Sequence, residues 1–257
     1  MRGLSRLDQR ICAAALMCGL LASFRAAAAV VSQCECPEGI VADGSGQVLG
    51  WDALHGGTPL IPAVTNSAAW VLPVLEEGGV SFNVASNPAS PLAFVSNAVA
   101  TVFLVVHPDL SPTNFAALLE VPGASVTAVP RVVQPSYDPE DAAGLSVRVN
   151  GEPSLALPAA PHIVEVDFPQ PVSGGELCVG GESACAAWRQ QWRGNVAGVI
   201  AFDTPPDEAV RRVVRSYLAR RHGIAGDFSP PGGGAVLKTM EQGVDLHGLF
   251  STRLFLK

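Results

Sequence analysis

The stretch WRGNVAGVIAFD, residues 192–203, decides the fold of this chain. It is apolar at nearly every position from residue 196 to residue 202, and this pattern predicts a β-strand. The sequence TPPDEAVRRVVRSYLARRHG follows at residues 204–223 and has a helical pattern instead. The two stretches together predict a strand that is followed directly by a helix.

The predicted helix has recognisable ends and one apolar face. Thr204 is an N-cap residue type, Pro205 suits the first helical position, and Gly223 suits the C-terminal end. Apolar residues recur between these ends at the helical period, and they are Val210, Val213, Val214, Tyr217 and Leu218. The opposite face carries three arginines that we expect to lie in solvent, and they are Arg211, Arg212 and Arg215.

The chain between residues 41 and 202 consists of short apolar runs separated by Gly, Pro, Asn and Ser. Besides residues 196–202, strands are predicted at residues 80–83, 100–107, 115–121, 125–133, 145–150, 162–168 and 176–179. Asn150-Gly151 is a strong hairpin signal, because a type I′ turn needs positive φ at both central residues. Val102 to Val106 is continuously apolar and predicts a central strand covered on both faces. Many short strands and one helix predict an all-β sandwich or barrel.

The same segments resemble the laminin-G-like, concanavalin A-like jelly-roll domains of exported proteins. Residues 192–203 look like the closing strand of that family, and residues 216–224 look like its terminal helix. Further matches in the right order are Trp51-Asp52-Ala53, residues 100–106, residues 147–151 and residues 178–181. The resemblance implies a jelly roll over residues 51–226. Gly198 stands where the family usually has Glu, and Ser81-Phe82-Asn83-Val84 replaces its usual F-D-G, so a family-type polar or metal site is not expected.

The N-terminus has the layout of a secretory signal peptide. Residues 1–29 contain a basic start, an apolar run over residues 11–24 and small residues at 26–29. Their removal takes away four arginines and one aspartate, which leaves 12 basic and 22 acidic residues and a net charge of −10. This acidic balance disfavours nucleic-acid binding. We expect the mature chain to be secreted, extracellular or at the cell surface (periplasmic if a bacterium retains it), with no transmembrane segment.

Export would leave four of the six cysteines in the mature chain. Cys178 and Cys185 are seven residues apart across a Gly-Gly pair, which suits a disulfide. A bridge between Cys34 and Cys36 would be a strained ring, so these two are expected to pair with Cys178 and Cys185 or with cysteines of another chain. The spacing is not that of a zinc ribbon, and we predict no metal site from it.

Catalytic patterns are incomplete in this sequence. Glu165-Val166-Asp167 begins the E-x-D-x-x-E motif of related glycoside hydrolases, but Pro169 and Gln170 follow and the third carboxylate is missing. We therefore expect a strand with an outward polar face and no enzyme activity. His107 and His162 flank predicted strand ends and are expected at the surface or in turns.

Candidate contact residues lie in two loops. Asp138, Glu140 and Asp141 form an acidic turn. Such an oxygen-rich loop can hold calcium, although this one has no EF-hand spacing. Trp188 is a candidate contact for a ligand or a partner chain. Residues 30–50 are expected to be an N-terminal extension that contains the Cys34 and Cys36 pair, and residues 227–257 a Gly/Pro linker and C-terminal tail.

These features favour a non-catalytic, exported recognition or assembly module that mediates protein–protein association in an extracellular or cell-surface structure. Only 15% of the residues are charged. A surface with few charged side chains is typical of one that other protein chains cover. The partners would be other protein chains, including copies of this chain through the C-terminal tail, and glycans. The alternative functions are a lectin-like carbohydrate-binding protein and, less favoured, a polysaccharide-active glycoside hydrolase.

Overall fold

The part of the chain that the structure describes forms strands and one helix, as the sequence predicts. The computed structural model describes residues 28–54, 57–64, 70–82, 88–95, 98–109, 116–121, 131–134, 145–153, 160–173, 175, 177–181 and 192–228. The strands are β1 (Val30–Glu35), β2 (Ile40–Ala42), β3 (Val48–Trp51), β4 (Leu60–Pro62), β5 (Val74–Glu76), β6 (Gly79–Ser81), β7 (Leu92–Phe94), β8 (Val99–Pro108), β9 (Ala116–Glu120), β10 (Arg131–Gln134), β11 (Ser146–Val149), β12 (His162–Val172), β13 (Cys178–Val179) and β14 (Gly194–Phe202). The helix is α2 (Glu208–Arg221).

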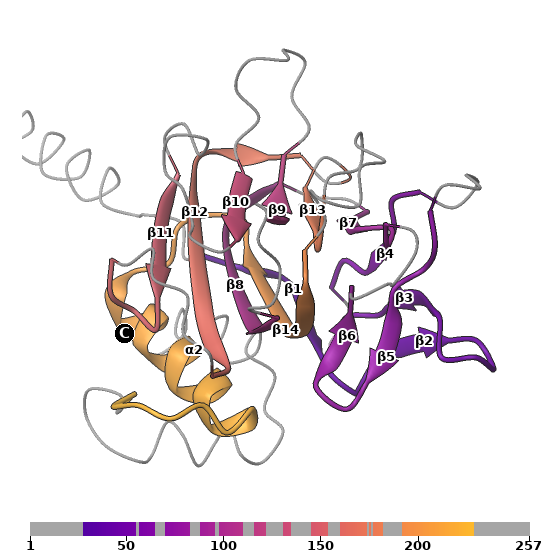
Figure 1. The fold of residues 1–257 in the computed structure, drawn as a ribbon. Coiled ribbons are helices and arrows are strands. Elements are labelled where there is room, and N and C mark those ends of the chain that lie inside the picture. Colours follow the sequence, from indigo (N-terminus) through magenta and orange to yellow (C-terminus); the bar gives the residue numbers. More distant parts are fainter. Residues whose placement is uncertain are drawn as a thin grey trace, which may run out of the picture.

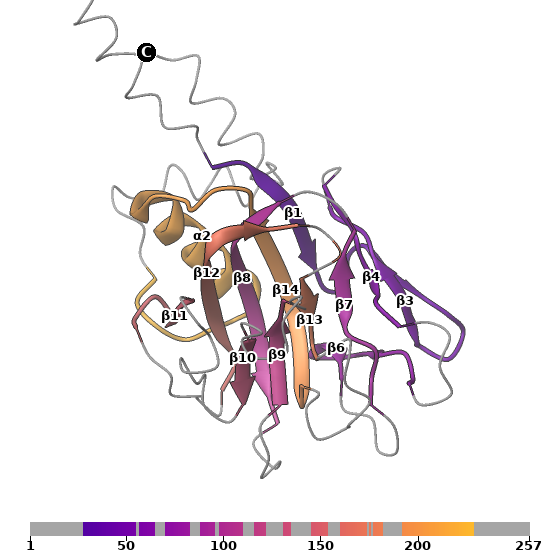
Figure 2. The same cartoon turned by 90° about the horizontal axis from the view of Figure 1, so that it is seen from above.

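These strands make two antiparallel sheets (Figures 1 and 2). The first has the order β11-β12-β8-β14-β6-β5, and β1 adds to β14 beside β6. We call it the helix-covered sheet, because α2 packs on it. The second sheet has the order β10-β9-β13-β7-β4-β3-β2. The described part of the chain is therefore all-β with one helix on one outer face.

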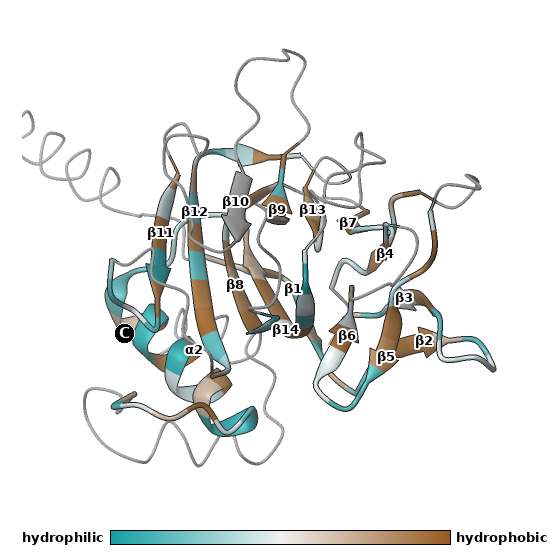
Figure 3. Ribbon diagram, viewed as in Figure 1, coloured by the Kyte–Doolittle hydropathy of each residue, from teal (hydrophilic) through white to brown (hydrophobic). Residues whose placement is uncertain are grey.

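The main core contains side chains of both sheets. Trp51, Leu60 and Phe94 from the second sheet join Val102 and Leu104 of β8 in one buried cluster. The alternate residues of β8 form a second cluster with α2. In Figure 3, β8 is brown, whereas β12 and α2 carry teal segments. The prediction that residues 102–106 are covered on both faces is confirmed.

The hairpin signal at Asn150-Gly151 is also confirmed. Asn150 has φ +53° and Gly151 has φ +90°, as a type I′ turn requires. The backbone N–H of Glu152 donates to the carbonyl of Val149 at 3.1 Å and closes the turn. Any Cβ at position 151 would lie 2.9 Å from Nε of Arg215, so glycine also allows the turn to lie against that guanidinium group.

The helix begins later than predicted. Its N-cap is Asp207, which has extended backbone angles and whose carboxylate accepts from the N–H of Val210 at 2.8 Å. The prediction of Thr204 as the cap is wrong, because Pro206 disfavours a helical conformation at Pro205. At the other end, Gly223 has φ +64° directly after the C-cap residue His222, as expected of a terminal glycine.

All eight predicted strands overlap strands of the structure, but the N-terminal third was underestimated. Residues 30–50, expected to be an extension, supply β1, β2 and most of β3. Strand β1 pairs with the second half of β14, with Val30 opposite Phe202 and Glu35 opposite Gly198. No helix in the described ranges has the length and apolarity that a membrane crossing requires.

Candidate functional site

Two clusters of polar side chains lie between α2 and the helix-covered sheet. Alternation along β12 places Glu165 and Asp167 on the face that α2 covers. Alternation along β1 does the same for Gln33 and Glu35. We call the first the arginine cluster, and its members are Arg148, Glu165, Asp167, Glu208, Arg211 and Arg215. We call the second the Glu35 cluster, and its members are Gln33, Glu35, Tyr217, Arg221 and His222.

Glu165 is the centre of the arginine cluster. One of its oxygens accepts from Nη1 of Arg148 at 2.7 Å and from Nη1 of Arg211, and the other accepts from Nη1 of Arg215 at 2.9 Å. Arg148 lies directly opposite Glu165 in the β11–β12 ladder, whereas the other two arginines come from α2. Three guanidinium groups thus converge on one carboxylate that is completely buried.

Two further carboxylates balance the charge of these arginines. Asp167 accepts from Nη2 of Arg211 at 2.8 Å and from the hydroxyl of Thr101 at 2.6 Å. Glu208 accepts from Nη2 of Arg215. Although burial disfavours a charged guanidinium, the carboxylates of Asp167 and Glu165 raise the pKa of Arg211 above its ordinary value. Arg211 therefore stays charged despite its burial.

This geometry corrects two expectations from the sequence. The side chains of Arg211 and Arg215 are only 7% and 8% exposed, so the prediction of a solvated arginine face holds for Arg212 alone. Glu165 is buried instead of facing outward on its strand. The physical reason is that the arginines of α2 face the carboxylates of β12. The opposite charges neutralise one another where both are buried.

The Glu35 cluster has a different chemistry. One oxygen of Glu35 accepts from Nε2 of Gln33 at 2.6 Å and from the hydroxyl of Tyr217 at 2.7 Å. The other oxygen lies 3.4 Å from Nε of Arg221 and 4.0 Å from Nε2 of His222. Glu35 is completely buried, yet most of its donors are neutral. Across the ladder, any Cβ at Gly198 would lie 3.1 Å from Nε2 of His222, so a glycine there leaves room for the imidazole.

Burial shifts the titration of this cluster. It raises the pKa of Glu35, and the hydrogen bonds from Tyr217 and Gln33 act in the opposite direction. Burial lowers the pKa of His222 to about 4, and the nearby charge of Arg221 adds to this shift. Within the described residues, Oε1 of Gln33, Oε2 of Glu35 and Nε2 of His222 are buried without a hydrogen-bond partner.

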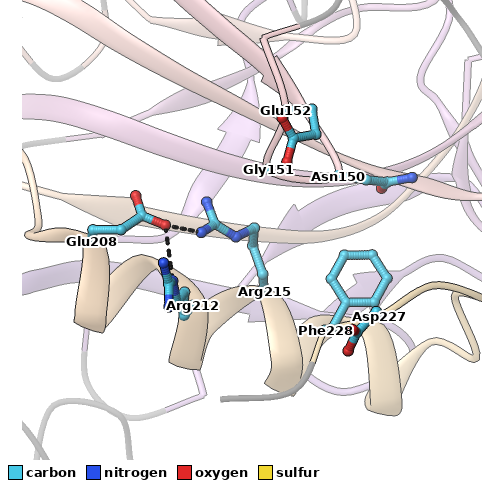
Figure 4. A pocket seen from close by; sticks show the side chains of 8 residues that line it. All are labelled: Asn150, Gly151, Glu152, Glu208, Arg212, Arg215, Asp227 and Phe228. Atoms are coloured by element: carbon cyan, nitrogen blue, oxygen red, sulfur yellow. Dashed lines mark hydrogen bonds and ion pairs between the residues drawn. The ribbon is translucent and has the colours of Figure 1, made fainter. Parts of the chain in front are cut away.

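A polar pocket opens beside the arginine cluster (Figure 4). Its volume is about 310 Å³. It lies between the hairpin, α2 and the segment that follows α2, and it is lined by Asn150, Gly151, Glu152, Glu208, Arg212, Arg215, Asp227 and Phe228. A smaller pocket of about 190 Å³ also contacts Phe228 and is lined by residues of the second half of α2. The polar pocket has no signal in the sequence, because its walls come from segments more than 50 residues apart.

The three described cysteines form no disulfide. Cys34 is buried in the main core, where its thiol contacts the carbonyl of Trp51 at 3.6 Å, and this burial disfavours a bond from Cys34 to another chain. Burial raises the pKa of Cys34 and of Cys36 to about 12. Cys178 lies on β13, and its expected partner Cys185 is outside the described residues.

The remaining predicted positions divide into two groups. His162 is buried rather than exposed, which corrects its placement, and burial lowers its pKa to about 4. His107 is half-buried at the end of β8. Several positions lie outside the described residues, and they are Asp138, Glu140, Asp141, Trp188, residues 1–27 and residues 229–257. In the described ranges, no three His, Cys, Asp or Glu side chains lie close enough together to hold a metal ion.

Comparisons of the chain with protein-family models, with curated proteins and with solved structures found no match.

Proposed function

We propose that this protein is a non-catalytic, exported recognition module of the laminin-G-like jelly-roll type, which associates with other protein chains. One observation carries the proposal, namely an apolar row across the outer face of the second sheet. Val41 lies opposite Gly50, and any Cβ at Gly50 would lie 3.9 Å from Cγ2 of Ile61. Ile61 in turn lies opposite Ala93. The row thus crosses β2, β3, β4 and β7 without a charged side chain.

The row is open to solvent at its large side chains. Val41 and Ile61 are 44% and 45% exposed, and Leu49 and Val95, on neighbouring positions, are 48% and 46% exposed. These are the four exposed large hydrophobic residues among those described. Helix α2 covers the other sheet and lies away from β2, β3 and β4 (Figure 1). Exposed apolar surface on a sheet face is typical of protein interaction sites.

The jelly-roll part of the proposal is supported by the placement of the family-like segments. Trp51 is buried in the core, the Asn150-Gly151 turn forms a hairpin, and β14 leads into α2. The catalytic alternative is less favoured, because the carboxylate that would serve a hydrolase, Glu165, is buried and occupied by three arginines.

The test is the native mass of the mature chain, measured by light scattering over a range of concentrations. We expect the wild type to form a multimer and Ile61→Asp to shift it to the mass of one chain. Ile61 is half-exposed, so the variant should keep the wild-type circular dichroism spectrum. Glu76→Gln, on an exposed position of the other sheet, is the matched control and should leave the mass unchanged.

A wild type that has the mass of one chain at all concentrations would overturn the proposal. A chain that lacks residues 229–257 tests in the same experiment whether the tail takes part in association.

A further inference from the structure

We propose that a signal peptidase hydrolyses the peptide bond between Ala28 and Ala29, and that the α-ammonium group formed on Ala29 binds the carboxylate of Asp203. This cleavage belongs to the export that the proposed function includes, and the inference rests on it. The boundary of the signal peptide moves by one residue from the one that the sequence predicts, from Ala29 to Ala28.

The contact between Ala29 and Asp203 lies where β1 begins. The backbone N–H of Ala29 donates to Oδ1 of Asp203 at 2.9 Å, and the backbone N–H of Asp203 donates to the carbonyl of Ala29 at 3.1 Å. The next pair along the ladder is Val30 opposite Phe202. Both backbone groups of Ala29 are therefore held, and its nitrogen is already hydrogen-bonded to a carboxylate.

The donors to this carboxylate oxygen are neutral groups. Besides the amide of Ala29, Oδ1 of Asp203 accepts from the hydroxyl of Thr204 at 3.1 Å. Asp203 is half-buried. A hydrogen bond with a charged donor is roughly twice as strong as one between neutral groups. A positive charge on the nitrogen of Ala29 would therefore strengthen a contact that is present in the uncut chain.

Hydrolysis of the bond before Ala29 places such a charge on this atom. Water adds across the bond, so that the carbonyl carbon of Ala28 takes the hydroxyl group and the nitrogen of Ala29 takes the proton. The new α-amino group has an ordinary pKa of about 7.7, so at neutral pH it binds a further proton and is mostly positive. The nitrogen is the atom that already donates to Asp203, so the ion pair needs no rearrangement of the strand.

The sequence before this bond has the pattern that a signal peptidase cuts. The pattern is a small residue at the first and at the third position before the cut, and Ala28 and Ala26 are these residues. A cut after Ala27 would place Arg25 at the third position, where a small residue is needed. A cut after Ala29 has alanine at both positions, so the pattern alone leaves two bonds open.

The structure distinguishes these two bonds by the chain that each cut would leave. A cut after Ala29 would remove both hydrogen bonds with Asp203. It would also put the charge on Val30, which is 9% exposed and packs in the apolar cluster under α2. Burying an ammonium group among apolar side chains is unfavourable. A cut after Ala28 removes only the contact of one alanine with that cluster. The chain that begins at Ala29 thus fits both the protease pattern and the fold.

The first experiment is N-terminal sequencing and intact-mass measurement of the full chain after secretion from a bacterial host. We expect a secreted chain that begins with Ala29-Val30-Val31. A secreted chain that begins at any other residue overturns the inference and leaves the proposed export intact. A chain that keeps residues 1–28 overturns both.

Two variants of the same chain separate the two bonds that the pattern leaves open. Ala28→Leu puts a large residue at the first position before the proposed cut and should abolish cleavage there. Ala27→Leu is the matched control, because it leaves both required positions of that cut unchanged but blocks the cut after Ala29. We expect Ala27→Leu to be cut between Ala28 and Ala29 like the wild type. Loss of cleavage in Ala27→Leu would overturn the inference.

The second experiment tests the ion pair in the secreted chain. Selective acetylation of the α-amino group removes its charge, and Asp203→Asn removes the charge of the carboxylate. Each change should lower the melting temperature by about 2–4 °C, the range for a well-placed ion pair in a chain of this size. The two changes together should lower it no further than one of them, because they break the same contact.

The control is Glu76→Gln, which removes a carboxylate from β5. Acetylation should lower the melting temperature of this variant as much as that of the wild type. The ion pair is overturned if acetylation leaves the melting temperature of the wild type unchanged, or if the effects of acetylation and of Asp203→Asn add.

Discussion

Glu165 and Glu35 are both completely buried glutamates, on the same face of the same sheet and under the same helix. Glu165 accepts hydrogen bonds from three arginines. Glu35 accepts from an amide and a phenol, and its nearest cation, Arg221, lies 3.4 Å away at a side chain that is 39% exposed. The two glutamates are equally buried, so the two regions differ in the charge of the groups that donate to each carboxylate.

The comparison shows how one helix can hold a sheet in two ways. At its N-terminal half, α2 is fixed by ion pairs whose loss would leave several charges buried. At its C-terminal half, α2 is fixed by hydrogen bonds from neutral groups to the carboxylate of Glu35, whose charged form is disfavoured by burial. Removing a buried charge that is surrounded by opposite charges costs unfolding free energy, because its partners are left buried without compensation. A buried charge with neutral partners can be replaced by a neutral side chain of the same shape at little cost.

The largest effect is expected for Glu165→Gln. This change leaves three guanidinium groups with one carboxylate fewer, and an uncompensated buried charge costs about 3–5 kcal/mol of unfolding free energy. Urea unfolding at neutral pH, followed by circular dichroism, measures it. A loss below 1 kcal/mol would mean that water reaches the arginines and that the cluster is not buried in solution.

Arg211→Met should be nearly as damaging, at about 3 kcal/mol, because it removes the contacts to both Glu165 and Asp167. Arg212→Met is the matched control on the next residue of the helix. Its side chain is 53% exposed, and the change should stay within about 0.5 kcal/mol. If both substitutions lowered the unfolding free energy equally, the cause would be a general disturbance of the helix and not the loss of the ion pairs.

The Glu35 cluster should make stability sensitive to acid through His222. Its folded pKa of about 4 lies below the value of 6.5 for the free group, so the stability it contributes is complete above pH 6.5 and is lost as the pH falls towards 4. The loss is up to about 3 kcal/mol. Unfolding of His222→Gln at pH 7 and at pH 4.5 should show a smaller difference than the wild type. His162→Gln, with a similar pKa outside the cluster, should give an independent and additive reduction.

The smallest effect is expected for Glu35→Gln. Since the folded pKa of Glu35 is raised, its contribution has the opposite sign: it is complete below the ordinary pKa of 4.5 and is lost as the pH rises through the folded value. The amide variant keeps the shape without the charge. At pH 8 it should be within about 1 kcal/mol of the wild type or more stable. A destabilisation as large as that of Glu165→Gln would contradict the comparison.

Local patterns in the sequence predicted local structure well. The Asn150-Gly151 turn, the covered strand β8 and the apolar stripe of α2 all follow from short-range rules, and all are present. The start of the helix could also have been found. Two successive prolines exclude helical geometry at Pro205, and Asp207 is the next residue able to cap.

The polar site could not be predicted in the same way. Arg211 and Glu165 are 46 residues apart in the chain, and nothing in the periodicity of either segment shows that they meet. An arginine stripe on a helix is usually solvated, and only the sheet face beneath it reverses that expectation. The strands β1 to β5 and β7 were missed for a related reason, since five of these six have three or four residues and their alternation is too brief to detect.

The pairing of β1 with β14 has a consequence for the order of events during synthesis. Val30 is opposite Phe202, so β1, the first strand of the described residues, must wait for about 170 further residues before its partner exists. Closing so long a loop is an entropic barrier, and folds with such distant pairings form slowly. The sheet that carries both buried glutamates is therefore completed late. Until then, the carboxylate of Glu35 remains in water, and its burial is among the last steps of folding.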